Sequence, residues 1–212
     1  MNSLNPENAF IFRIAHIGNV PWILNHGLHC RNSPERDPNY VEIGNPELIE
    51  KRRHRIVPIP PGGMLSDYIP FYFTPHSPML LNIKTGHNGI PRRPMSEIVI
   101  MVSALPGLGA QKIQFVFTDR HAYLQTASFF SDLSQLDRIP WALLETRDFK
   151  KDVYDPGKFE RYQAEALVHR HLPVAALSAI ICHGDAQATQ LRGEIEKRRQ
   201  TLQVAVKPNC YF

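Results

Sequence analysis

Residues 97–103 read Glu-Ile-Val-Ile-Met-Val-Ser, and the segment is apolar at nearly every internal position. A short apolar run of this kind predicts a buried strand. Other strand patterns flank it in the sequence, at residues 10–15, 68–73, 114–118, 164–169, 177–182 and 202–206. They interleave irregularly with helical patterns. We therefore predict a mixed α+β fold, in one domain that spans residues 1–212.

Three helices are predicted by a shared start signal, in which a capping side chain precedes a proline of the first turn. The pairs are Asn19 with Pro21, Asn45 with Pro46, and Ser77 with Pro78. Apolar spacing predicts two further helices, at residues 124–136 and at 185–200, the second capped by Asp185. Residues 31–40 are polar and predict a loop, and residues 58–63 predict a tight turn.

Composition narrows the class of protein. The 212 residues are 43% hydrophobic and 21% charged, which is typical of a globular domain. The net charge of +4 attracts polyanions, although a solvated basic surface explains it equally well. Three widely spaced cysteines make no disulfide framework and indicate a reducing compartment. No membrane span and no signal peptide are evident, and Met1 to Asn8 is polar, so we expect a cytoplasmic protein.

Two motif-like patterns are interpreted as structural. Gly107-Leu108-Gly109 follows an apolar strand, but Lys112 occupies the place of the third small residue of a dinucleotide-binding fingerprint, so a plain turn is predicted. His26, His29 and Cys30 lie close together, as do Cys182 and His183, without the ligand spacing of a zinc site. No metal is expected.

Residues 67–79 carry the least ordinary composition in the chain, with four aromatics, three prolines and a histidine. Aromatic rings next to cations suit single-stranded nucleic acid, because bases stack on rings while phosphates take the charge. A core strand flanked by turns explains the same composition. Composition alone leaves the two interpretations open.

Charged residues elsewhere are equally ambiguous on their own. Arg52, Arg53 and Arg55 end a predicted helix, where cations favour the helix dipole and also suit a phosphate. Residues 117–121 (Phe-Thr-Asp-Arg-His) end a strand in a polar cluster, either a satisfied turn or part of a site. Glu165 lies at the edge of an apolar strand, and a buried carboxylate needs partners or a raised pKa.

Five ordered blocks together resemble the DarT family of DNA ADP-ribosyltransferase toxins. They are residues 11–19 (IFRIAHIGN), 48–52 (LIEKR), 62–73 (GGMLSDYIPFYF), 115–121 (FVFTDRH) and 162–166 (YQAEA). The resemblance covers nearly the whole chain and is closer to the branch that modifies thymidine than to the one that modifies guanosine. It implies an ADP-ribosyltransferase fold, with a split mixed sheet, surrounding helices and NAD bound in the cleft.

The resemblance also implies roles for individual residues. Glu165 matches the catalytic glutamate, Arg52 the catalytic arginine, and His121 a residue near the reacting groups. The positions that hold NAD are Arg13, Ile14 and Ala15, together with Arg52. The residues that meet the target nucleotide of single-stranded DNA are Tyr72, His76 and Met79.

The implied reaction transfers ADP-ribose from NAD to thymidine and releases nicotinamide, and a macrodomain antitoxin of the DarG type is the implied partner. Glu165 would stabilise the positive charge that builds on the ribose. Since arginine is almost always protonated, we expect Arg52 to stabilise negative charge on the thymine oxygens rather than to act only as a base. Two alternatives are an ADP-ribosyltransferase acting on guanine or RNA, and a non-catalytic single-strand binder.

Overall fold

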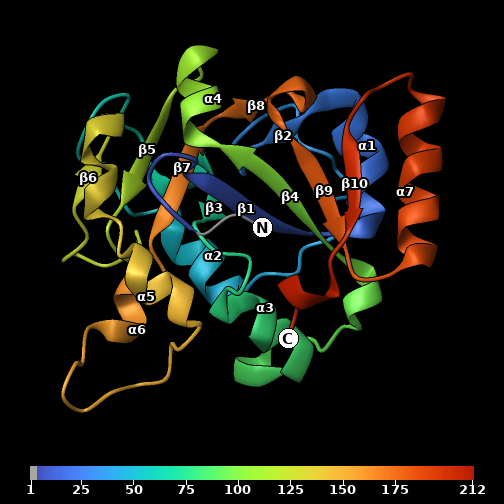
Figure 1. Cartoon of the computed structure of the whole chain (residues 1–212). Helices are drawn as coiled ribbons and strands as arrows, with labels where there is room; N and C mark the ends of the chain where they lie inside the picture. The colour runs from blue at the N-terminus through green and yellow to red at the C-terminus, as the bar shows by residue number, and fades with distance from the viewer. Residues whose placement is uncertain (1–3) are drawn as a thin grey trace.

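A computed structural model of the protein describes residues 4–212 and shows one large mixed sheet wrapped by short helices (Figure 1). The eight strands run in the order β10-β9-β4-β1-β3-β7-β5-β6, and β2 and β8 form a separate two-stranded sheet. The strands are β1 (Phe10–His16), β2 (Leu28–His29), β3 (Tyr68–Tyr72), β4 (Ile98–Ala104), β5 (Phe115–Thr118), β6 (Phe129–Phe130), β7 (Glu165–His169), β8 (His171–Leu172), β9 (Ala179–Cys182) and β10 (Gln203–Val206).

The large sheet is divided in its middle. β1 pairs with β4 along seven residues and β3 pairs with β7 along five, but β1 and β3 pair only at Phe12 and Tyr72. Only β9 and β10 run parallel among the paired strands described. The two halves of the sheet therefore separate on either side of one residue pair. This arrangement confirms the predicted split mixed sheet.

Helices cover both faces of the sheet. They are α1 (Val20–His26), α2 (Pro46–Arg52), α3 (Pro78–Thr85), α4 (Leu105–Ala110), α5 (Trp141–Thr146), α6 (Lys158–Arg161) and α7 (Asp185–Lys197). α1 and α7 bury Ile23 and Leu191 in one core, whereas α3 buries Leu80 and Ile83 in the core on the other face. Full burial of each such side chain contributes about 1.5–3 kcal/mol. The strand over residues 97–103, predicted as buried, is β4, whose first six residues are buried.

The helix start signals act as predicted at two of three sites. Asn45 accepts a hydrogen bond from the Leu48 N–H at 3.0 Å, and Ser77 accepts one from the Leu80 N–H at 3.2 Å. Asn19 precedes α1 but does not cap it. Its side chain instead forms two hydrogen bonds with the backbone of Val41, and so ties the start of α1 to the loop before α2.

Three other predictions are corrected by the structure. Residues 124–136 are not a helix, because Phe129 and Phe130 pair with β5 as strand β6 and a 3-10 helix follows at Leu133–Arg138. The glycines of residues 107–109 lie in the short helix α4 rather than in a turn. Asp185 is the first residue of α7 rather than its cap, and the Gln187 side chain accepts the N–H groups of His183 and Gly184.

None of the helices found in residues 4–212 is long and apolar enough to cross a membrane. Of the polar stretch from Met1 to Asn8, the first three residues lie outside the described part of the chain.

Candidate active site

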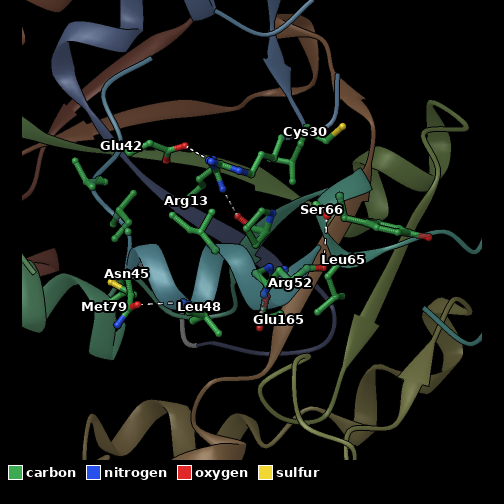
Figure 2. Close-up of a pocket in the computed structure, with 18 of the residues that line it drawn as sticks. Arg13, Cys30, Glu42, Asn45, Leu48, Arg52, Leu65, Ser66, Met79 and Glu165 are labelled. Atoms are coloured by element: carbon green, nitrogen blue, oxygen red, sulfur yellow. Dashed lines mark hydrogen bonds and ion pairs between the residues drawn. The ribbon is translucent and has the colours of Figure 1, made fainter. Parts of the chain in front are cut away.

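A cavity opens where the sheet splits, between β1, β3, β7, helix α2 and the loop that joins β2 to α2. Figure 2 shows Arg52 and Glu165 together at one end of α2, with Asn45 and Met79 at the other end. Arg13 reaches across the split, and its Nη1 donates to the Pro70 carbonyl at 2.8 Å. The break in the sheet thus exposes side chains that an unbroken sheet would cover.

Glu165 is the first residue of β7 and lies opposite Tyr72 in the register of the sheet. The residue is 3% exposed. Its Oε2 accepts a hydrogen bond from Arg52 Nη1 at 2.9 Å, and its Oε1 accepts the Ala122 N–H at 3.0 Å. A buried carboxylate requires such partners, because an unpaired buried charge is costly.

These partners fix the charge of Glu165. Burial alone raises the pKa of its carboxyl, but the guanidinium of Arg52 and the Ala122 N–H outweigh burial and hold that pKa below the ordinary value. Glu165 therefore stays ionised at neutral pH in a site from which water is largely excluded. Electrostatic stabilisation of a cation is strongest in such surroundings.

Arg52 ends α2, where the helix dipole favours a cation. Its side chain is 11% exposed, and its Nη2 is buried without a hydrogen-bond partner among residues 4–212. One side of the guanidinium thus holds Glu165 while the other keeps a donor available. The neighbouring Arg53 is 47% exposed and contacts Glu50, so of these two arginines only Arg52 contacts the Glu165 carboxylate.

His121 lies beside the same carboxylate, with its Nδ1 3.5 Å from Glu165 Oε1. Burial lowers the pKa of His121, so the ring is neutral at neutral pH. The Tyr123 N–H donates to Nδ1 at 3.2 Å, which places the ring proton on Nε2. His121 therefore presents one N–H donor at the end of the cavity near Glu165.

The remaining predicted site residues divide between the cavity and its surroundings. Arg13, Ile14, Tyr72 and Met79 line the same cavity as Arg52, His121 and Glu165. Ala15 is fully buried in the core and can offer only its backbone. His76 is 5% exposed, its Nε2 contacts the Asn209 carbonyl at 2.8 Å, and it lines a different cavity.

Three charged residues of this cavity escaped the sequence analysis. Arg31 and Arg36 lie in the loop predicted over residues 31–40. Both donate to a single oxygen, Oε1 of Glu42, and all three residues line the cavity. Arg36 also lies over the Tyr40 ring, 4.8 Å from its centroid. The available signal was the concentration of arginines and acids in residues 31–42.

Among residues 4–212, no group of three or more His, Cys, Asp or Glu side chains is arranged to hold a metal ion. His29 instead contacts the Ser33 hydroxyl through Nδ1 and the His26 carbonyl through Nε2, each at 3.0 Å. Cys182 lies in β9, where its thiol contacts backbone carbonyls.

Comparison with known proteins identifies this arrangement. The structure of a Thermus sp. 2.9 DarT in complex with ADP-ribosylated single-stranded DNA superposes with a TM-score of 0.91 and 30% identity, covering 100% of both chains. The NAD⁺ complex of that protein superposes with a TM-score of 0.84, covering 98% of this chain and 99% of the other. Sheet order and cleft chemistry together place the chain among the enzymes that transfer ADP-ribose.

Sequence comparison gives the family. A DNA ADP-ribosyl transferase of Escherichia coli O127:H6 is 50% identical over 99% of this chain and 96% of its own length. One from Thermus sp. strain 2.9 is 33% identical over 100% of both. The family model described as DarT, ssDNA thymidine ADP-ribosyltransferase, matches residues 12–212, and the chain belongs to this family.

A more distant relative links the transferase to a second activity. The DNA ADP-ribosyl transferase-DNA ADP-ribosyl glycohydrolase fusion protein of Thermosipho africanus is 21% identical over 98% of this chain, which covers 50% of that protein.

Proposed function

We propose that this chain transfers ADP-ribose from NAD to a thymine base in single-stranded DNA, with Glu165 as the central catalytic residue. The observation that carries the proposal is the buried, ionised carboxylate held between Arg52 and the Ala122 N–H in the split of the sheet. Membership of the DarT family supports the same acceptor.

The charge of the cavity suits the diphosphate of NAD. Four arginines and two glutamates line it, which leaves a net charge of +2 with the histidines neutral. The Nε atoms of Arg13 and Arg31 and the Nη2 of Arg52 are buried without partners among the described residues. Guanidinium groups with unused donors bind phosphate oxygens well. We assign the diphosphate to Arg13, Arg31 and Arg36, and the rest of the donor to the adjacent backbone of β1.

Glu165 acts on the ribose of the donor. Cleavage of the bond between nicotinamide and ribose moves the bonding electrons to the pyridine ring and builds positive charge on the sugar. The fixed carboxylate stabilises that charge, and a hydrogen bond to a ribose hydroxyl would also align the sugar. The ordered surroundings of Glu165 mean that no solvent needs to reorganise at the moment of reaction.

Arg52 and His121 act on the acceptor. The ring nitrogen of thymine that attacks the sugar releases its proton to solvent, and negative charge spreads to the neighbouring carbonyl oxygens. The free Nη2 donor of Arg52 and the Nε2 donor of His121 are placed to stabilise that charge. Tyr72 lines the cavity next to them and offers a ring on which the flipped base can stack.

The setting of the reaction follows from its substrates. DNA and NAD meet in the cytoplasm of a bacterium, so we place the activity there. The fusion of a transferase with a DNA ADP-ribosyl glycohydrolase in Thermosipho africanus supports a toxin role for this chain, with a macrodomain antitoxin of the DarG type as its partner.

One experiment tests the proposal. Purified protein is incubated with NAD and a thymine-containing oligonucleotide, either single-stranded or in its matched duplex, and the modified base is mapped by mass spectrometry. We expect thymine to be labelled in the single strand only, because exposing a paired base costs a few kcal/mol. Glu165→Gln, which keeps the size of the side chain, is expected to lower the rate about a hundredfold or more. Labelling confined to guanine, to RNA or to protein would contradict the thymine assignment.

A further inference from the structure

A second cavity lies beside the catalytic one and has no role in the reaction described above. It is lined by three segments: Thr74–His76 after β3, Leu144–Arg147 at the end of α5, and Val206–Cys210 after β10. The two cavities share one stretch of chain, because Tyr72 and Met79 line the catalytic cavity while Thr74 to His76 line the second. Residues 72–79 therefore form the ridge between them.

Two cations, Arg147 and Lys207, line this second cavity together with one acid, Glu145. The side chains of Arg147 and Lys207 form no hydrogen bond or ion pair with any other residue of the described range 4–212. Both residues line the cavity, Arg147 just after α5 and Lys207 just after β10. Glu145 is exposed, as Arg147 is, and it forms no ion pair with either cation. The charged side chains thus leave a positive excess.

Apolar side chains accompany these cations. Leu4, Leu144 and Val206 contribute to the lining, and His76 closes the inner side with its ring bonded to the Asn209 carbonyl. A cavity that combines apolar side chains with unpaired cations suits a nucleotide, whose base contacts the apolar lining while its phosphate meets the charge.

The distance to the reacting groups fits a neighbouring nucleotide. Tyr72 lies opposite Glu165, and His76 is four positions later in the chain. Four residues of extended chain span at most about 14 Å. This is the length of about four nucleotides at a rise of 3.4 Å each. A single strand with its target base in the catalytic cavity can therefore cross the ridge and enter the second cavity.

We propose that the second cavity binds a nucleotide flanking the target thymidine in the same single strand, with Arg147 and Lys207 contacting its phosphates. The inference rests on the proposed function for the direction of the strand, but it can fail separately. The subsite would favour longer substrates over short ones and would contribute to the choice of sequence around the target base.

The test measures binding without catalysis. The Arg147→Gln, Lys207→Gln double variant and the wild type are titrated with a fluorescent single-stranded oligonucleotide of about a dozen nucleotides, without NAD, over a range of salt concentrations. The salt slope is the slope of the logarithm of the binding constant against the logarithm of the salt concentration. Each lost phosphate contact lowers its magnitude by about 0.7 and thereby weakens binding about fivefold at 0.1 M salt. We therefore expect the double variant to lose about 1.4 from the slope and to bind about 25-fold more weakly.

A control variant that loses the same number of cations elsewhere shows whether the position of the lost cations matters. Lys197→Gln with Arg199→Gln removes two exposed cations, one at the last residue of α7 and one just beyond it. Helix α7 lies at the other edge of the molecule from α5 (Figure 1). This control is expected to bind with the wild-type salt slope. Transfer to a single thymidine nucleotide, which has no neighbour to enter the second cavity, is expected to be equal in all three proteins, which also shows that the variants are folded.

Equal salt slopes and affinities for the double variant and the wild type would overturn the subsite. An equal loss in the α7 control would do so too, since the effect would then reflect net charge alone. Neither result would affect the assignment of thymine as acceptor, which depends on the mass mapping of the modified base.

Discussion

Removal of the Arg52 side chain tests the centre of the site most directly. In Arg52→Ala, Glu165, which is 3% exposed in the intact protein, would keep the Ala122 N–H and lose its cation. Breaking a buried ion pair by removing one partner costs about 3–5 kcal/mol. For a chain of this size the midpoint of thermal unfolding should fall by about 6–20 °C. Arg53→Ala is the matched control, and loss of its exposed contact with Glu50 should cost at most about 1 kcal/mol.

The pH dependence separates this mechanism from a simple packing defect. Without Arg52, burial raises the pKa of Glu165 above its ordinary value of 4.5, so the penalty is present while the carboxylate is ionised and shrinks as falling pH protonates it. The loss of stability should therefore be larger at neutral pH than in mild acid. The double variant Arg52→Ala, Glu165→Gln should recover part of it at neutral pH, because no charge is left buried.

Urea unfolding of the four proteins at a series of pH values provides the measurement. A loss for Arg52→Ala that does not change with pH, or that Glu165→Gln fails to reduce, would refute the reasoning about the buried pair. A larger effect on stability and on transfer from Arg53→Ala would show that the roles of the two arginines are exchanged.

Three further predictions concern the cavity and the fold. Arg31→Gln combined with Arg36→Gln should raise KM for NAD about tenfold or more with little change in kcat, since these donors bind the diphosphate equally in ground and transition states. Steady-state kinetics measures both constants, and a fall in kcat alone would exclude this role. Tyr72→Ala should weaken modification of the oligonucleotide by about 1–3 kcal/mol and leave NAD binding unchanged, as measured by titration with each ligand. Burial lowers the pKa of His76 from 6.5, so the unfolded state binds more protons and the free energy of unfolding should fall as the pH drops below about 6.5. His76→Gln should show a shallower fall in urea unfolding, and an unchanged fall would contradict this origin.

The elements of the sheet were predictable because burial leaves a pattern in the sequence. The run at residues 97–103 is apolar because β4 is covered on both faces, and the helices after Asn45 and Ser77 carry their own caps. The wrong prediction of a helix at residues 124–136 has the same origin. The apolar residues there have helical spacing, but they pack against a neighbouring strand instead: Phe130 packs on Phe117 with 5.5 Å between ring centroids. Tertiary contacts decide whether such a segment forms a helix or a strand.

The site was harder to predict, because each of its charges acquires meaning from a distant partner. Glu165 on its own is an ordinary carboxylate. Its role becomes visible only when it pairs with Arg52, which lies 113 residues earlier in the sequence. Residues 31–40 were predicted only as a loop, because nothing local shows that Arg31 and Arg36 converge on Glu42 over a cleft. Asn19 had the sequence of a helix cap, and only the fold shows that it holds Val41 instead.

The register of the sheet is the step that joins fold and site. Phe12, Tyr72 and Glu165 are consecutive partners across β1, β3 and β7, so their side chains share one face. The Phe12–Tyr72 pair is also the only one that joins β1 to β3, and the cavity opens beside it. A shift of β7 by one residue would turn Glu165 to the opposite face and bury it without Arg52. The same pairing therefore splits the sheet and aims the carboxylate into the split, which neither the sequence of β3 nor that of β7 shows alone.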